Sequence, residues 1–298
     1  MKLYRKVMLI FLALMVVFSF SACKDKKIEG TENMTPQQII ENTALRLEDV
    51  NSYTAKVTQN VSMNSNGNEV GASGLTEIIF FKEPLKVKIT QAQDETTQEE
   101  LKKVSYVEEK NDTVTTYMNY NNEWLKVDAT KENTKQVLQS YNPAENMISF
   151  LKEVKDIKED AREEVNGTKV IILSGVLPKE AVPAIVEETQ ALQFVGMSNL
   201  KPELFEGIAE LPITFQIEEA TGDILGYSFD LHSILQTLTD NTMKALMGDT
   251  QTAQIQVSKC FVEVICSDYN NAPEIEIPQE ALNAPVYTGT QTPIPEQQ

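Results

Sequence analysis

Few side chains in this chain of 298 residues are placed for acid–base or nucleophilic chemistry. Its single histidine, His232, lies between Asp230 and Ser233. A Ser-His-Asp triad would have to use this histidine, but the serine is its neighbour in sequence and no Gly-x-Ser-x-Gly sequence occurs. One histidine also supplies too few ligands for a histidine-based zinc site. We therefore interpret His232 as a residue at the start of a helix.

The carboxylates form no pattern that selects a catalytic pair. Pairs such as Glu218-Glu219 and Glu108-Glu109 are common in a chain with 44 acidic residues. The run Asn64–Glu69 resembles a calcium loop only loosely, because it lacks the first Asp and the closing Glu, and a turn fits it better. No P-loop or Gly-x-Gly-x-x-Gly motif is present. The sequence predicts a protein that is not an enzyme and that uses no cofactor and no metal.

Two of the three cysteines lie in one apolar run near the C-terminus. Cys260 and Cys266 are six residues apart in a run typical of a strand. Six residues of strand span about 20 Å, whereas a disulfide requires Cα atoms within about 7 Å. Neither cysteine is near a histidine in sequence, which disfavours a thiolate enzyme. We expect two buried, free thiols.

The first 23 residues have the pattern of an exported lipoprotein. A basic start precedes an unbroken apolar run over residues 7–18. This order is typical of a secretory signal peptide, and the run is shorter than the roughly 20 residues that a membrane span needs. The ending Phe20-Ser-Ala-Cys23 resembles a bacterial lipobox, although Phe20 departs from the usual leucine. The resemblance implies cleavage before Cys23 and an N-terminal diacylglyceryl cysteine that anchors the chain to the outer face of the cell membrane. The alternative is an ordinary signal peptide with a chance cysteine.

The charge balance limits the partners of the chain. It has 26 basic and 44 acidic residues, and loss of residues 1–22, which contain three basic residues and no acidic one, would give a net charge of −21. Such a surface repels nucleic-acid phosphates and anionic membrane surfaces. We therefore expect no nucleic-acid partner, and we expect the lipid to hold the chain on the membrane.

Folding is predicted to begin after a polar tether over residues 23–34. Thr35, Pro36 and Gln38 predict a helix start with a capping box. Two apolar stripes at helical spacing follow in the chain: Ile39, Ile40, Thr43, Ala44, Leu47 and Val50 in the first helix, and Met147, Ile148, Leu151 and Val154 in the helix after Asn142. From Tyr53 the apolar period changes from helical spacing to two, which indicates a half-buried strand. Helices are expected over 35–50, 131–140, 142–154, 179–195, 202–209 and 233–247. Strands are expected over 53–63, 75–81, 85–89, 103–108, 113–119, 123–127, 157–163, 169–177, 212–218, 224–230 and 254–267.

This order predicts an α+β fold in one domain over residues 35–284. Strands with short turns indicate an antiparallel sheet, and the helices are needed to cover its apolar face. Residues 285–298 contain three prolines and no period, and we expect a disordered tail.

Four segments resemble LolA-like and LppX-like lipoproteins, a superfamily with members in Gram-positive bacteria. They are Asn51–Lys56, Phe80–Lys88, Tyr117–Val127 and Glu274–Leu282. The resemblance implies a strongly curved antiparallel sheet, an open half-barrel, with helices covering its concave face. It also implies that a lipid carrier of this kind holds acyl chains between sheet and helices.

The apolar face of the sheet is therefore the candidate ligand surface. We predict a binder of a lipid or another apolar ligand. The same residues would equally form a core under the helices, and the alternative function is a structural or sensory cell-envelope module with a filled core and protein partners. An apolar cavity of several hundred Å³ that opens to solvent favours the binder. The predicted ligand-binding residues are Tyr53, Val57, Val61, Met63, Ile78, Phe80, Val87, Ile89 and Trp124.

Overall fold

The computed structural model covers most of the chain beyond the predicted tether. The predicted signal peptide, Cys23 and most of the predicted helix over 131–140 lie outside the described residues. In the part that is described, no helix is long and apolar enough to cross a membrane. The described residues are 31–65, 67–120, 123–130, 132, 134, 142–165, 167–189, 191–192, 195–197, 199–248 and 255–287.

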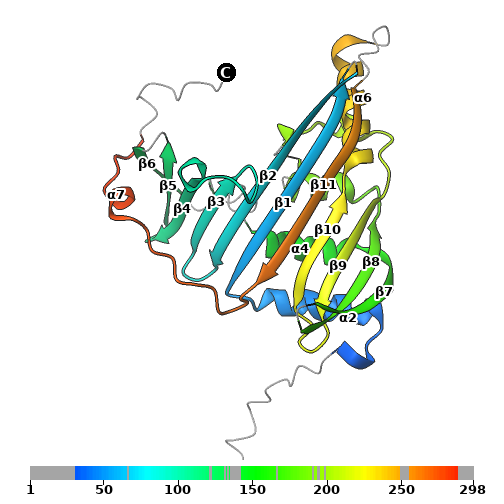
Figure 1. Cartoon of the computed structure of the whole chain (residues 1–298), viewed down its shortest axis with the longest axis horizontal. Coiled ribbons are helices and arrows are strands. Elements are labelled where there is room, and N and C mark those ends of the chain that lie inside the picture. Colours follow the sequence, from blue (N-terminus) through cyan, green and yellow to red (C-terminus); the bar gives the residue numbers. More distant parts are fainter. Residues whose placement is uncertain are drawn as a thin grey trace, which may run out of the picture.

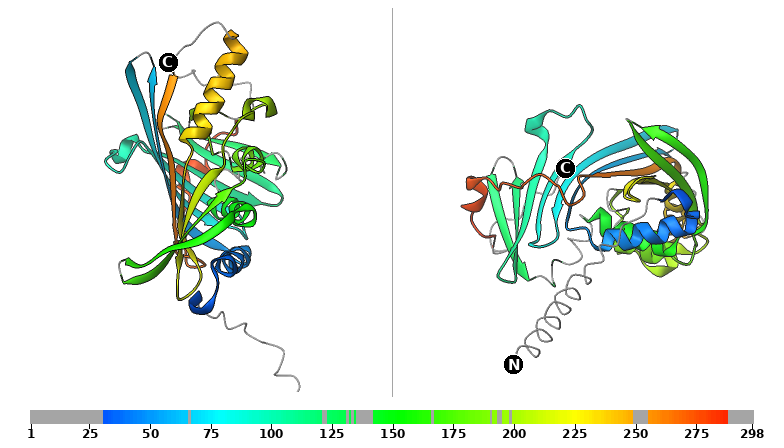
Figure 2. Two further views of the ribbon diagram at one scale, coloured as in Figure 1. Left: turned by 90° about the vertical axis from the view of Figure 1, so that its right-hand side faces the viewer. Right: turned by 90° about the horizontal axis from the view of Figure 1, so that it is seen from below.

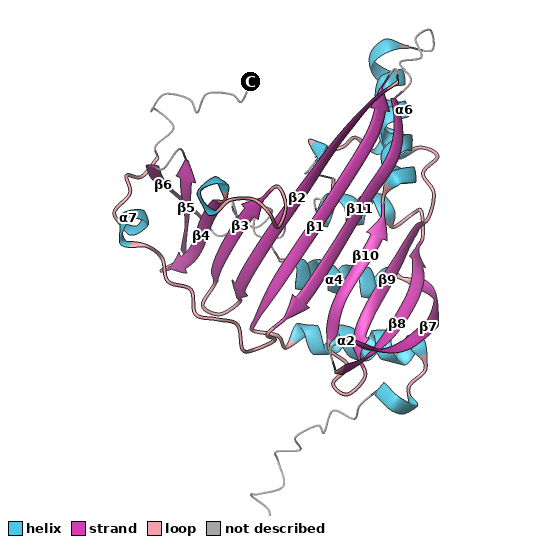
Figure 3. Ribbon diagram, viewed as in Figure 1, coloured by secondary structure: helices cyan, strands magenta, loops and turns pink. Residues whose placement is uncertain are grey.

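One antiparallel sheet of eleven strands organises the fold (Figures 1 and 3). Its order is β6-β5-β4-β3-β2-β1-β11-β10-β9-β8-β7, so the last strand pairs with the first at the centre, and β6 and β7 are the edge strands. The sheet is strongly curved and does not close into a barrel (Figure 2), which confirms the predicted fold class. The strands are β1 (Ser52–Ser65), β2 (Asn68–Phe81), β3 (Lys86–Ala92), β4 (Lys103–Lys110), β5 (Thr113–Tyr120), β6 (Glu123–Thr130), β7 (Lys155–Val165), β8 (Thr168–Leu177), β9 (Leu211–Glu218), β10 (Ile224–Asp230) and β11 (Ile255–Ser267).

The helices lie inside the curve of the sheet, apart from the short α7 (Figure 2). The first of them begins at the predicted capping box, since the Thr35 N–H donates to Gln38 Oε1 at 2.9 Å and the Gln38 N–H donates to Thr35 Oγ1 at 3.3 Å. Its buried stripe includes Ile39, Ile40 and Leu47, as the helical spacing predicted. The helices are α2 (Pro36–Glu48), α4 (Pro143–Glu153), α5 (Val182–Thr189), α6 (His232–Met247) and α7 (Gln279–Leu282), with 3₁₀ turns η1 (Thr31–Asn33), η2 (Glu99–Leu101) and η4 (Pro202–Phe205).

Two predicted helices are shorter in the structure. The helix expected over 179–195 is α5, and it begins only at Val182 because Pro183 has no N–H and is tolerated only in a first helical turn. The helix expected over 202–209 is the single turn η4, and the chain leaves it through Gly207 at φ +79°, a left-handed conformation that glycine adopts readily. Helical composition therefore overstated the length of both elements.

The main core lies between the helices and the concave face of the sheet. Phe150 of α4 is 1% exposed, and its ring centroid lies 5.4 Å from that of Tyr227 and 5.5 Å from that of Phe229, both on β10. The two cysteines of β11 are buried and free in this core, as predicted. Burial raises the pKa of each of the Cys260 and Cys266 thiols to about 12, so both remain protonated at neutral pH.

The opposite face of β3–β6 is covered by residues within 272–287, which we call the C-terminal strap (Figure 2). Ile275 and Ala281 of the strap form a second apolar cluster with Tyr106 and Tyr117, and Trp124 packs against it. Lys86 Nζ donates to the Ile275 carbonyl at 2.6 Å. Residues 285–287 extend along the edge strand, where Lys126 and Val286 form a parallel bridge. The remainder of the predicted tail, residues 288–298, lies outside the described residues.

Trp124 is the only tryptophan of the chain, so its fluorescence reports on this cluster. We expect Ile275→Ala to shift the Trp124 emission to longer wavelength and to destabilise the protein by about 2 kcal/mol, because it opens a cavity between strap and sheet. Glu276→Ala, at the exposed neighbouring position, is the control and should change neither property. An unchanged emission spectrum in Ile275→Ala would show that the strap does not shield Trp124.

Candidate functional site

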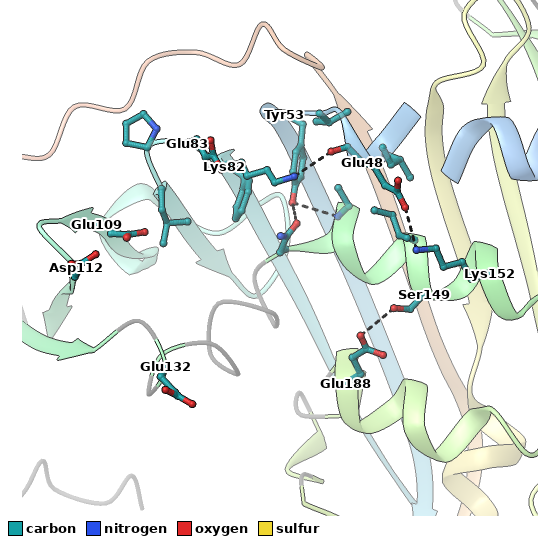
Figure 4. A pocket seen from close by; sticks show the side chains of 18 of the residues that line it. Glu48, Tyr53, Lys82, Glu83, Glu109, Asp112, Glu132, Ser149, Lys152 and Glu188 are labelled. Atoms are coloured by element: carbon teal, nitrogen blue, oxygen red, sulfur yellow. Dashed lines mark hydrogen bonds and ion pairs between the residues drawn. The ribbon is translucent and has the colours of Figure 1, made fainter. Parts of the chain in front are cut away.

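A cleft with a volume of about 1250 Å³ lies between one end of the sheet and the helices α2, α4 and α5 (Figure 4). Its wall includes the β2–β3 turn, residues 82–85, and the β4–β5 turn, residues 111–112. β1 begins at the same end of the sheet, which we call the cleft end. The opposite end, where β1 turns into β2 at Gly67, is called the hairpin end. The cleft opens to solvent, so a ligand has access to it.

The apolar part of the cleft is built from both layers of the fold. Tyr53 of β1 stacks on Phe80 of β2 with ring centroids 5.3 Å apart. The Tyr53 hydroxyl donates to Asn142 Oδ1 at 2.8 Å and accepts from the Ala144 N–H at 3.4 Å. These bonds join β1 to the first turn of α4, so the aromatic pair and α4 are held in a fixed relation. The further apolar lining residues are Leu47, Val50, Pro84, Leu85, Ala144 and Ile148.

The rim of the cleft is charged, with six carboxylates and two lysines among its lining residues. Lys152 Nζ lies 3.2 Å from Glu48 Oε1, which joins α4 to the end of α2. Lys82 Nζ donates to the Glu48 carbonyl at 3.2 Å, and Ser149 Oγ donates to Glu188 Oε1 at 3.1 Å (Figure 4). The other carboxylates of the lining are Glu83, Glu109, Asp112 and Glu132. The cleft therefore joins an apolar interior to a polar mouth, an arrangement that fits an amphipathic molecule.

The structure separates the nine predicted ligand-binding residues into three groups. Tyr53 and Phe80 line the cleft. Both also belong to the main core, at 1% and 5% exposed, and six others belong to this core without lining the cleft: Val61, Ile78, Val87 and Ile89 are buried, and Val57 and Met63 are half-buried and packed against it. For these six the structure supports the core interpretation.

Trp124 lies on the other face of the sheet, and the prediction that it shares the apolar concave face is wrong. On β5 and β6, Trp124 pairs with Asn119, whereas its neighbour Leu125 pairs with Met118. Met118 in turn pairs with Ser105, and Ser105 pairs with Ile89, so Leu125 lies on the same face of the sheet as Ile89. Trp124 therefore lies on the other face, which the C-terminal strap covers. There the Trp124 ring lies 5.8 Å from the ring of Tyr106.

Sequence reasoning missed the helical half of the cleft. Ile148 belongs to the apolar stripe predicted for α4, but it is half-buried whereas Met147 is completely buried. Leu47 and Val50 likewise belong to the stripe predicted for the first helix. The stripes indicate that these residues face inward. They do not indicate which of them meet another side chain and which meet an open cleft.

His232 lies outside the cleft, at the start of α6, as predicted. Its Nδ1 is 3.0 Å from Asp230 Oδ1, and its Nε2 is 3.2 Å from Ser233 Oγ. The structure thus brings the three candidate triad residues together, but the His232 and Asp230 side chains are about half exposed. Asp230 Oδ1 also accepts from the His232 backbone N–H at 2.9 Å, which satisfies one of the free N–H groups at this helix start. Among the residues that the structure describes, no group of three or more His, Cys, Asp or Glu side chains is arranged to hold a metal ion.

Comparison with known proteins relates the chain to one family and to several solved folds. Residues 35–201 match the model of a family of unknown function, DUF6612. No curated protein matches the chain. Solved structures that align with it include the lipoprotein LppX of Mycobacterium tuberculosis, which is 10% identical over 81% of this chain and 98% of LppX, with a TM-score of 0.46.

Two further solved structures are similar in the same way. LprF of Mycobacterium bovis is 13% identical over 83% of this chain and 97% of LprF, with a TM-score of 0.44. A LolA superfamily protein of Nitrosomonas europaea is 8% identical over 81% of this chain and 95% of its own, with a TM-score of 0.26. The TM-scores of these matches are all below 0.5, so the resemblance to LppX-like and LolA-like lipoproteins stays a prediction. At these identities and TM-scores the matches support no statement about function.

Proposed function

We infer the function of this chain, which belongs to the family of unknown function DUF6612, from its cleft. We propose that it is a non-enzymatic protein that binds a lipid or another amphipathic, largely apolar ligand between sheet and helices. The observation that supports this proposal is the cleft of about 1250 Å³ with an apolar interior and a charged mouth. Small-molecule sites typically have about 300–1,000 Å³, so the cleft has room for an acyl chain.

The expected affinity follows from the apolar interior. Each buried methylene contributes about 0.8 kcal/mol, so eight methylenes would contribute roughly 6 kcal/mol before the cost of ordering the ligand is subtracted. Tyr53, Phe80 and Ile148 would contact this part of the ligand. The polar end would lie among the charged groups of the rim, which remain accessible to water.

The location that fits this function is the outer face of a cell membrane. We propose that Cys23 carries a diacylglyceryl group and that the domain is held there by its acyl chains, because two chains suffice for stable anchoring. The membrane is then both the anchor of the protein and the source of apolar ligands.

The alternative is a structural or sensory module of the cell envelope that acts through protein partners. This alternative is supported by the packing of eight of the nine predicted ligand-binding residues in the main core, so much of the concave face is filled. The two functions differ in whether the cleft holds a ligand.

The test is the ligand content of the chain carrying Cys23→Ser and produced without residues 1–22, so that neither the apolar signal segment nor an acyl anchor is present. Native mass spectrometry should detect a bound lipid of discrete mass. After delipidation, a 16-carbon fluorescent fatty acid should bind saturably and be displaced by oleate. A folded chain with neither a co-purifying lipid nor saturable binding would contradict the binder and favour the module.

A further inference from the structure

The described part of the chain begins at the same end of the sheet as the mouth of the cleft. Thr31 is completely buried, and both its N–H and its hydroxyl donate to the Glu219 carbonyl, at 3.0 and 2.8 Å. Glu219 directly follows β9, in the turn to β10. Because the sheet is antiparallel throughout, this turn lies at the end where β2 turns into β3 and β4 into β5. The entry point of the chain is therefore fixed at the cleft end.

The length of the preceding segment limits how the domain can sit on a membrane. Eight peptide steps separate Cys23 from Thr31, and fully extended they reach about 28 Å. β1 has 14 residues and spans about 43 Å from the cleft end to the hairpin end. If the hairpin end touched the bilayer and the strands were perpendicular to it, Thr31 would lie about 43 Å from the surface. The tether reaches only about 28 Å. An anchor at Cys23 thus holds the cleft end near the bilayer.

We propose that the cleft end is the membrane-facing surface of this protein and that its ligand passes directly between the bilayer and the mouth of the cleft. The proposal rests on the proposed function, through the anchor at Cys23 and the apolar ligand. The partner surface is a lipid bilayer, and the ligand is one of its own amphipathic components.

The composition of the cleft end agrees with contact at a bilayer of low charge. Leu45 on α2 (63% exposed) and Val165 at the end of β7 (47% exposed) can contact an interface, but Val70 near the hairpin end is 64% exposed, so the length of the tether rather than apolar exposure selects the cleft end. Exposed Glu163 and Glu164 precede Val165, and like charges would hold this end away from a strongly anionic surface. The negative charge of this end therefore favours contact with a zwitterionic bilayer.

The orientation is measurable with two fluorophore positions on the lipidated full chain. Ala220→Cys places a thiol in the exposed β9–β10 turn at the cleft end, and Asn68→Cys places one at the exposed hairpin end. The native Cys260 and Cys266 are buried, and their raised pKa values keep them unreactive at neutral pH. Each variant is labelled and reconstituted into phosphatidylcholine vesicles that contain a rhodamine-labelled lipid as energy acceptor.

We expect energy transfer to the vesicle surface to be several-fold more efficient from position 220 than from position 68. Insertion of a 20-residue Gly-Ser segment after Lys27 is the matched control, and it should reduce the difference because the longer tether removes the constraint. Equal transfer from both positions, or more from position 68, would overturn the proposal, as would a chain that is not lipidated at Cys23.

The route of the ligand is tested separately. A fluorescent 16-carbon fatty acid in the cleft should leave for acceptor vesicles at a rate that rises with vesicle concentration, as contact transfer requires. A rate independent of vesicle concentration would overturn direct passage. Failure to bind the fatty acid while position 220 still faces the bilayer would refute the proposed binding function and leave the orientation in place, so the two failures are distinguishable.

Discussion

Replacing Ile148 by tryptophan is expected to remove the bound ligand while changing the free energy of unfolding by no more than about 1 kcal/mol. Ile148 is half-buried on α4 and lines the cleft, so an indole at this position extends into open volume rather than into packed side chains. The ligand then competes with a covalently attached group for the same apolar space. Native mass spectrometry of the chain carrying Cys23→Ser, produced without residues 1–22, gives the ligand content, and chemical denaturation gives the stability.

Met147→Trp is the matched control, because it introduces the same side chain one residue earlier on the same helix. Met147 is completely buried in the main core, so tryptophan overpacks it and should cost about 1–3 kcal/mol. The folded fraction should still hold the ligand. If Ile148→Trp keeps its full ligand content, or if both variants are destabilised equally, the cleft is not the binding site.

Phe150→Ala is expected to lower the free energy of unfolding by about 3–5 kcal/mol, the largest effect on stability that we predict. Phe150 is 1% exposed and packs edge-on against Tyr227 and Phe229, with interplanar angles of 58° and 59°. Removal of the phenyl ring leaves a cavity at the point where α4 packs against β10. For a domain of this size the loss corresponds to roughly 6–20 °C in melting temperature.

The same substitution should also weaken ligand binding, because α4 forms one wall of the cleft and holds Ile148 in place. Glu153→Ala, at an exposed position at the end of α4, is the control and should change stability by less than about 0.5 kcal/mol. A loss of less than 1 kcal/mol in Phe150→Ala would mean that α4 is held chiefly by its contacts with α2 and α5 rather than by this aromatic cluster.

Local patterns predicted most of the fold. The capping box at Thr35 and the change of period at Tyr53 depend only on residues within a few positions of each other, and the structure reproduces both. The free cysteines also followed from local geometry, because a strand holds Cys260 and Cys266 too far apart to bridge. The class of fold followed from the order of these elements.

The candidate site was predicted only in part. Tyr53 and Phe80 line the cleft, but the alternation that selected them selected equally well six other core residues that do not line it. Whether an inward side chain meets another side chain or an open cleft depends on where α4 and α5 dock. Those helices begin more than 60 positions after both Tyr53 and Phe80 in the chain.

The position of Trp124 shows which feature the sequence determined and which feature only the tertiary structure decided. Alternation within one strand determines which residues share a face, but on β6 the neighbours Trp124 and Leu125 are both apolar, so the sequence did not state which of them faces the helices. Both side chains are half-buried, Trp124 against the second apolar cluster under the C-terminal strap and Leu125 on the opposite face. The pairing of Asn119 with Trp124 decided the question, and strand register is set by contacts between strands rather than by either strand alone. The cleft has the same origin, because the curvature of eleven strands and the docking of separate helices create a space that no single segment encodes.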